Sequence, residues 1–200
     1  HLDDLAQDLE TPQSVAAKVG TRVRLGDKHP YGLPVGGMIG TGKKITLDLS
    51  KAAGVALAKR LIAHCDGVIE NFTPRVLEGW GLGWETIQAA NPRAILVRMP
   101  AFGLSGPWRD HTGFAQTMEQ LSGLAWITGH PHDQPRIQRG PCDPLSGMHA
   151  AWAFLAALAQ REATGRGVHV ECTMVEAALN AAAEAIVEFG ASGRVLERMG

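Results

Sequence analysis

Short apolar runs alternate with helix-like segments along this chain, and this alternation constrains the fold more than any other feature. Four runs read as strands, namely residues 45–49, 67–72, 94–99 and 168–173. Helical patterns lie between them, for example over residues 52–64 after a predicted N-cap at Ser50, and over residues 146–163. Because strands alternate with helices, the sequence predicts an α/β fold with a parallel sheet and helices on both faces.

Composition narrows the class of protein. The 200 residues, 45% of them hydrophobic, suffice for one compact domain without disulfides. The three cysteines lack a Cys-x-x-Cys spacing, which favours a reducing compartment and predicts a cytoplasmic protein. We expect no signal peptide and no membrane span, and a formal net charge of −1 leaves no basic footprint for nucleic acid. A small molecule or another protein chain is therefore the expected partner.

Asp143 is the residue most expected to carry chemistry, because it stands between a Gly/Pro-punctuated loop and a long alanine-rich helix. One interpretation is a helix cap, in which the carboxylate accepts backbone N–H groups of the first turn, worth about 1 kcal/mol, with Pro144 preset for that turn. The other is chemical, since the same N–H groups would keep the carboxylate ionised as a nucleophile or proton carrier at a pocket mouth. The two interpretations are compatible.

The ends of two predicted strands offer a binding surface. In open α/β sheets, ligands bind beyond the carboxyl ends of the strands, which indicates Asn71, Phe72 and the loop at residues 102–107. Phe72 could present a flat surface to adenine or pantetheine while Asn71 orients the ligand. The alternative is an ordinary turn asparagine beside a core phenylalanine. No Walker-type loop and no G-x-G-x-x-G after a strand is present, which disfavours a nucleotide-triphosphate enzyme.

Two further patterns are weaker. Cys142 and His149 could form a cysteine–histidine nucleophile, but their separation at a helix start does not place the side chains face to face. His130, His132 and Asp133 could suggest a metal, but they lack a third strong ligand at a sensible spacing, so a solvated loop is favoured.

Several short segments occur in an order that is typical of one family. They are residues 43–49, 68–74, 81–84, 91–93, 103–107, 122–124, 143–147 and 164–167, which together cover most of residues 43–180. In this order and spacing the chain resembles the family III CoA-transferases, the group that contains formyl-CoA transferase, carnitine CoA-transferase and alpha-methylacyl-CoA racemase.

The resemblance implies a Rossmann-like large domain, a dimer of two interlocked chains and a set of roles. Asp143 matches the catalytic aspartate of the family. The positions that match the CoA site are Leu47, Asp48, Asn71, Phe72 and Thr73. In the implied mechanism Asp143 attacks an acyl-CoA thioester, an aspartyl-CoA thioester follows, and an acceptor carboxylate takes the CoA. The CoA thioester is then a substrate, and no tightly bound cofactor or metal is expected.

The chain also departs from the family pattern. The racemase branch carries Gly-His-Asp where this chain has Gly113, Phe114 and Ala115, so a two-base proton shuttle would lack one base. From the resemblance we expect residues 1–42 to form a divergent N-terminal segment and residues 43–200 to form the large-domain core, with the family's smaller domain absent from this chain.

Two alternatives to a CoA-transferase stay open. The chain could be an acyl-CoA racemase or isomerase, or a non-catalytic CoA-binding or dimer-scaffold domain in which Asp143 only caps a helix. The expected protein partner is a second copy or a complementing chain.

Overall fold

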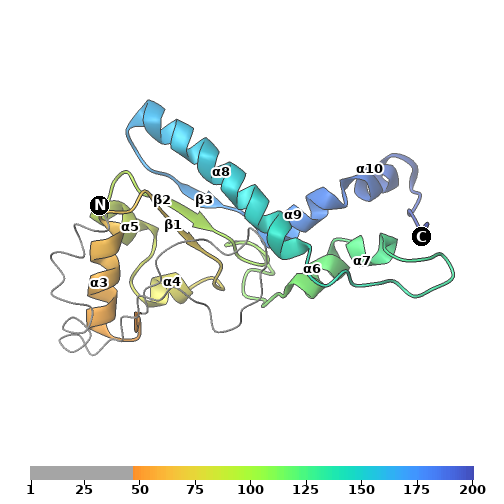
Figure 1. The fold of residues 1–200 in the computed structure, drawn as a ribbon, viewed down its shortest axis with the longest axis horizontal. Coiled ribbons are helices and arrows are strands. Elements are labelled where there is room, and N and C mark those ends of the chain that lie inside the picture. The colour runs from red at the N-terminus through yellow and green to blue at the C-terminus, as the bar shows by residue number, and fades with distance from the viewer. Residues whose placement is uncertain (1–46) are drawn as a thin grey trace, which may run out of the picture. The chain divides into compact units, whose positions relative to one another are not determined.

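A computed structural model describes residues 47–200, which fall into two compact units. The described part of the first unit comprises residues 47–66 and 78–92, and the second comprises residues 67–77 and 93–200. The predicted domain boundary after residue 42 lies outside the described residues. The elements in chain order are α3 (Ala52–Ile62), β1 (Gly67–Glu70), α4 (Val76–Gly79), α5 (Trp84–Ala90), β2 (Ile95–Arg98), α6 (Ala115–Leu121), α7 (Leu124–Ile127), α8 (Cys142–Thr164), β3 (His169–Glu171), α9 (Met174–Ala181) and α10 (Ala183–Ser192) (Figure 1).

In the first unit, α3 packs against α5. Leu57 and Ile62 lie on the buried face of α3, and Ile87 is the buried residue of α5. The Asn91 side-chain amide, just after α5, donates to the backbone carbonyls of Ile62 at 3.3 Å and Cys65 at 2.9 Å. These carbonyls lie at the end of α3 and just beyond it, where regular helical hydrogen bonding stops. Asn91 therefore fastens the end of one helix to the end of the other.

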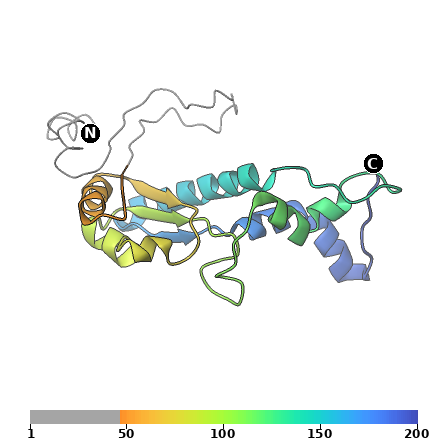
Figure 2. The same cartoon turned by 90° about the horizontal axis from the view of Figure 1, so that it is seen from below.

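In the second unit, three parallel strands form a sheet in the order β1, β2, β3. All four residues of the central strand β2 are buried, as a continuous apolar run in a parallel sheet predicts. The long helix α8 packs on β2 and β3, where Ala150 and Ala157 meet Ile95 and Val97 in one core (Figures 1 and 2). The α/β class with a parallel sheet is confirmed.

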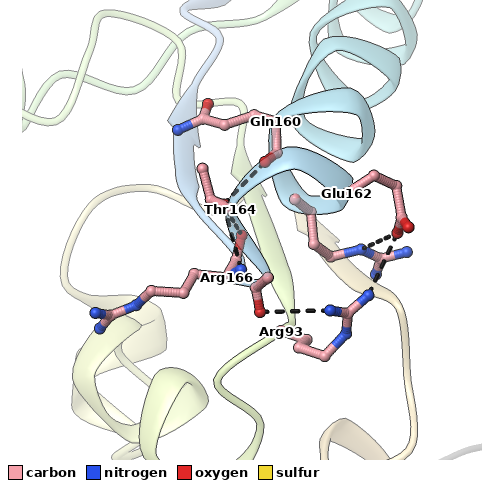
Figure 3. A network of polar contacts seen from close by, with 7 residues as sticks. Arg93, Gln160, Glu162, Thr164 and Arg166 are labelled. Carbon is pink, nitrogen blue, oxygen red and sulfur yellow. Dashed lines mark hydrogen bonds and ion pairs between the residues drawn. The ribbon is translucent and has the colours of Figure 1, made fainter.

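The sequence Thr164-Gly165-Arg166-Gly167 forms the turn from α8 into β3, and the geometry of this turn requires both glycines (Figure 3). Gly165 has φ 73° and ends α8 in the left-handed conformation that glycine adopts without strain. Gly167 is required for a different reason, because a Cβ there would lie 1.8 Å from the Ala94 carbonyl oxygen. The Arg93 guanidinium donates to the Gly165 carbonyl at 3.4 Å and pairs with Glu162 at 3.3 Å. The predicted turn is confirmed.

The predicted strand at residues 45–49 is not a strand in its described part, residues 47–49. Residues 47–49 lie in coil and turn, and residues 45–46 lie outside the described residues. Ser50 is not the N-cap of α3 either, since Lys51 takes that position. The Ser50 hydroxyl instead donates to the Asp48 carboxylate at 2.5 Å, which builds a local turn before the helix.

In the described residues, no helix combines the length and the apolar character that crossing a bilayer requires.

Candidate active site

Asp143 lies two residues past the N-cap of α8, whereas the cap interpretation places it at the N-cap itself. The helix begins at Cys142, and Pro141 takes the N-cap position. The Asp143 side chain is exposed, and no hydrogen bond or ion pair engages it among the described residues. The cap interpretation is therefore wrong. Pro144 still falls in the first turn, where its missing N–H has no intrahelical partner to lose.

The start of α8 is anchored by Cys142, which is fully buried in a core with Met118 and Ala178. Burial raises the pKa of the Cys142 thiol to about 11, and the negative charges of Glu119 and Asp143 add to the effect. A buried, protonated thiol is a poor nucleophile. The core position of Cys142 thus fixes the backbone that carries the neighbouring Asp143.

His149 does not act with Cys142. Its Nδ1 lies 2.8 Å from the Leu145 carbonyl oxygen, which can only accept, so Nδ1 carries the proton. Its Nε2 then accepts from the Asn180 side-chain amide at 2.9 Å. Both ring nitrogens are engaged with partners other than the thiol, as the sequence separation indicated.

The first turns of α8 lie at the carboxyl end of β3. Cys172, which directly follows β3, has its Sγ 4.0 Å from the Ser146 carbonyl oxygen, and the Ser146 hydroxyl donates to the Met174 carbonyl at 3.5 Å. The parallel strands all end at this edge, and strands lie about 4.8 Å apart. The residues after β1 therefore follow at about 10 Å along the edge from β3. Asp143 and the segment at residues 71–73 thus belong to the same edge of the sheet.

The segment after β1 is exposed at all three predicted positions, Asn71, Phe72 and Thr73. Phe72 keeps 43% of its surface exposed, so it is not a core phenylalanine. Arg75, at the end of the segment, has φ 77° and pairs with Asp110 at 2.8 Å. A left-handed arginine is a strained conformation that the surroundings must hold.

Leu47 and Asp48 belong to the first unit and are described with it. Leu47 is half-buried. The Asp48 carboxylate accepts the Ser50 backbone N–H at 3.1 Å and pairs with Lys51 at 3.2 Å. The hydrogen bond from the Ser50 hydroxyl, followed by that from Lys51, lowers the pKa of Asp48 below its usual range. Asp48 is therefore a carboxylate at neutral pH.

Sequence reasoning missed the charged residues at the ends of the three strands. Glu70, Arg98 and Glu171 stand in register across the sheet as the last residues of β1, β2 and β3. Glu70 accepts the Phe72 N–H at 2.8 Å, and Glu171 accepts the Leu104 N–H at 2.7 Å. Each carboxylate thus holds the loop beyond a strand. The sequence signal that could have revealed these residues is a charged residue at the end of each predicted strand.

The loop after β2 contains a cluster of aromatic rings that includes one histidine, His111. Phe102 meets Trp108 and His111 edge to face, with ring centroids 6.0 Å and 6.4 Å apart. Phe114 occupies the position of the histidine in the racemase branch, at the N-cap of α6, and 71% of its surface is exposed. A phenylalanine there has no group that can take or give a proton.

The loop before α8 contains two stacked imidazole rings. His130 and His132 have ring centroids 5.7 Å apart. Within residues 47–200, no group of three or more histidine, cysteine or acidic side chains is arranged to hold a metal ion.

The α/β fold and the exposed carboxylate near the carboxyl edge of its sheet can now be compared with known protein families. The chain belongs to CoA-transferase family III, whose sequence profile matches residues 37–200. The resemblance inferred from the motifs is confirmed.

The relatives support this assignment. Succinyl-CoA–D-citramalate CoA-transferase of Chloroflexus aurantiacus is 43% identical over 159 residues, which cover 79% of this chain and 40% of the relative. The beta subunit of succinyl-CoA–L-malate CoA-transferase from the same organism is 36% identical over 160 residues, with the same coverage. A crystal structure of a CaiB/BaiF family protein from Brucella suis superposes with a TM-score of 0.74 at 31% identity, covering 78% of this chain and 41% of that one. This chain spans about two fifths of the length of these relatives.

Proposed function

We propose that this chain transfers CoA from an acyl-CoA to a carboxylic acid, with Asp143 as the nucleophile. The observation that carries the proposal is the Asp143 carboxylate, exposed and without a protein partner among the described residues, in a chain of this family. It stands in the first turn of a 23-residue helix. The positive end of the helix dipole favours the ionised carboxylate without occupying its oxygens.

Four steps complete the exchange. An Asp143 oxygen attacks the thioester carbonyl of the donor, the C–S bond breaks, and CoA leaves as a thiolate from a mixed anhydride. The thiolate then attacks the aspartyl carbonyl and releases the donor acid as a carboxylate. The acceptor carboxylate attacks this aspartyl-CoA thioester, forming a second anhydride and freeing the thiolate. The thiolate finally attacks the acceptor's acyl carbon and restores Asp143.

The CoA-binding residues we propose are the predicted ones, and each group lies within its own unit. The exposed ring of Phe72 offers a flat surface to adenine or pantetheine, and Asn71 and Thr73 beside it can donate and accept hydrogen bonds. Leu47 supplies apolar contact. The ionised Asp48 suits a donor group such as a ribose hydroxyl or an adenine amino group, and it would repel a phosphate.

The proposed reaction consumes only a CoA thioester and an acid, so it requires no tightly bound cofactor. The cysteine pattern supports the cytoplasm as its place.

We further infer that α8 packs against a second copy or a complementing chain. Met148, Trp152 and Leu155 lie on one helical face and are 63%, 72% and 64% exposed. Such a contiguous apolar stripe marks an interaction surface. A relative that is named as a subunit supports the complementing chain as the second possibility.

Hydroxylamine trapping tests the chemistry. Because anhydrides and thioesters react with hydroxylamine, incubation of the full chain with succinyl-CoA should convert Asp143 to a hydroxamate that peptide mass spectrometry locates. Succinyl-CoA is the first donor to try because the names of two relatives contain it. The isosteric variant Asp143→Asn is the control and should stay unmodified. An unmodified wild-type chain that still binds CoA would instead support the scaffold hypothesis.

Exchange of the α-proton tests the racemase hypothesis. A wild-type chain that exchanges this proton of an acyl-CoA with deuterated water, without transfer to an added acid, would replace the CoA-transferase proposal. The phenylalanine at position 114 predicts that no such exchange occurs.

A further inference from the structure

Glu119 is a buried acidic residue that the mechanism above does not use. It lies on α6, its surface is 0% exposed, and its carboxylate faces the loop that leads into α8. Its Oε1 accepts the Gly140 backbone N–H at 2.7 Å, and its Oε2 accepts the Arg139 backbone N–H at 3.2 Å. Both oxygens are acceptors for consecutive backbone donors, which is the role of a carboxylate.

The two residues that Glu119 holds have an unusual backbone. Arg139 has φ 64° and Gly140 has φ 118°, so two consecutive residues lie in the left-handed region. Only two non-glycine residues in the described part have a positive φ, Arg75 and Arg139. Each stands in a loop of the candidate site. A strained residue persists only where its surroundings hold it, and here the surroundings are one buried carboxylate.

The loop is coupled to the nucleophile over a short stretch of chain. Gly140 is separated from Asp143 by Pro141, whose φ is fixed by its ring, and by Cys142, which is fully buried. The packing also places Glu119 near the same point, because Met118, its neighbour on α6, lies in one core cluster with Cys142. The backbone between Gly140 and Asp143 thus has little freedom to absorb a displacement.

We propose that Glu119 is the positioning residue of the nucleophile: its buried carboxylate binds the left-handed Arg139–Gly140 turn and so fixes the direction in which Asp143 leaves α8. This inference rests on the proposed function of Asp143. Glu119 touches no substrate and acts through the loop. Removing it should slow the attack on the thioester and leave acyl-CoA binding largely unchanged, since misplacing a reacting group by about 1 Å can lower a rate about a hundredfold.

The experiment compares Glu119→Gln and Glu119→Ala with the wild type in two measurements. The amide of Glu119→Gln keeps the side-chain shape but offers one acceptor oxygen for two N–H groups, and Glu119→Ala offers none. The exposed Glu197→Gln is the charge-matched control. Unchanged hydrogen-exchange protection of the β2 amides verifies that each variant is folded. If Glu119→Ala does not fold, the near-isosteric Glu119→Gln still tests the proposal.

The first measurement is hydrogen exchange at the Arg139 and Gly140 amides, which needs no activity. Protection should fall in the order wild type, Glu119→Gln, Glu119→Ala, by about tenfold or more in Glu119→Ala. Unchanged protection would overturn the proposal, whatever the activity.

The second measurement is the rate of hydroxamate formation at Asp143 together with the Kd of the acyl-CoA. We expect a rate at least about tenfold lower in Glu119→Ala, with Kd within about twofold of the wild type. Lost protection with an unchanged rate would overturn the positioning role. A wild-type chain that forms no hydroxamate would overturn both the proposed function and this role. In that case the hydrogen-exchange measurement would still show whether Glu119 holds the Arg139–Gly140 turn, so the two failures can be told apart.

Discussion

Arg98 donates to the buried carboxylate of Glu70 at 2.5 Å, and the same carboxylate accepts the N–H of Phe72. The pair joins the last residues of two neighbouring strands, and both side chains are at most 4% exposed. One carboxylate thus links the sheet to the predicted CoA-binding segment.

The Glu70–Arg98 pair should matter for stability far more than an exposed pair. Arg98→Met leaves a buried carboxylate without its cation and should lower the free energy of unfolding by about 3–5 kcal/mol in urea titrations. Arg194→Met, which breaks the far more exposed pair with Glu188, is the control and should cost at most about 1 kcal/mol. Equal losses in the two variants would show that burial does not strengthen the first pair.

Asp143→Asn should separate catalysis from stability. Because the carboxylate makes no cap, the free energy of unfolding should change by less than about 1 kcal/mol. CoA transfer should fall at least about a thousandfold, because the amide is not a nucleophile. Calorimetry and a transfer assay with succinyl-CoA measure the two effects. A large loss of stability would return Asp143 to a capping role.

Cys142 should matter at alkaline pH and not in catalysis. Its pKa rises from an ordinary 9.0 to about 11 in the folded state, so the folded chain retains a proton that the unfolded chain loses. This contribution to stability is fully present below about pH 9 and is lost as the pH rises through about 11. Cys142→Ala should therefore show a smaller drop in urea midpoint between about pH 8 and about pH 10 than the wild type. A strong loss of transfer activity in a folded Cys142→Ala would revive the thiol nucleophile.

Two glycines should respond in opposite directions to alanine. Gly167→Ala places a Cβ against the Ala94 carbonyl and should lower the free energy of unfolding by at least about 2 kcal/mol. Gly190 lies inside α10 with open space at its Cβ position, so Gly190→Ala should stabilise the chain by about 0.5–1 kcal/mol. Thermal unfolding of both variants measures this difference. Equal shifts of the melting temperature in the two variants would refute the prediction.

The apolar face of α8 should decide whether the chain associates. Trp152→Glu puts a charge in the centre of the stripe and should halve the mass that light scattering reports for a homodimer. Gln160→Glu, an exposed position near the end of α8, is the control and should leave the mass unchanged. A wild-type chain of monomer mass would restrict the partner to a complementing chain.

Some of this protein follows from sequence alone. The runs at residues 67–72, 94–99 and 168–173 predict three strands, and the structure has all three. Of these, the central strand β2 is buried at all four residues, which is where a parallel sheet needs a continuous apolar run. The Thr164–Gly167 turn can also be predicted, because Gly165 suits the left-handed end of the helix and Gly167 suits a close approach of two backbone segments. The order of motifs identifies the family. These features are local, so neighbouring residues carry the information.

Other features exist only in the folded chain. The Asp-Pro sequence resembles a cap, but the burial of Cys142 in the core starts α8 earlier and leaves Asp143 free of a cap. Glu119 and Glu70 look like surface charges in the sequence. Their partners are a turn that follows Glu119 by 20 residues and an arginine 28 residues after Glu70. Hydrogen bonds over such separations depend on which elements pack together. The sequence by itself therefore determined the α/β class and the family. Only the tertiary structure decided which side chains hold the loops of the candidate site.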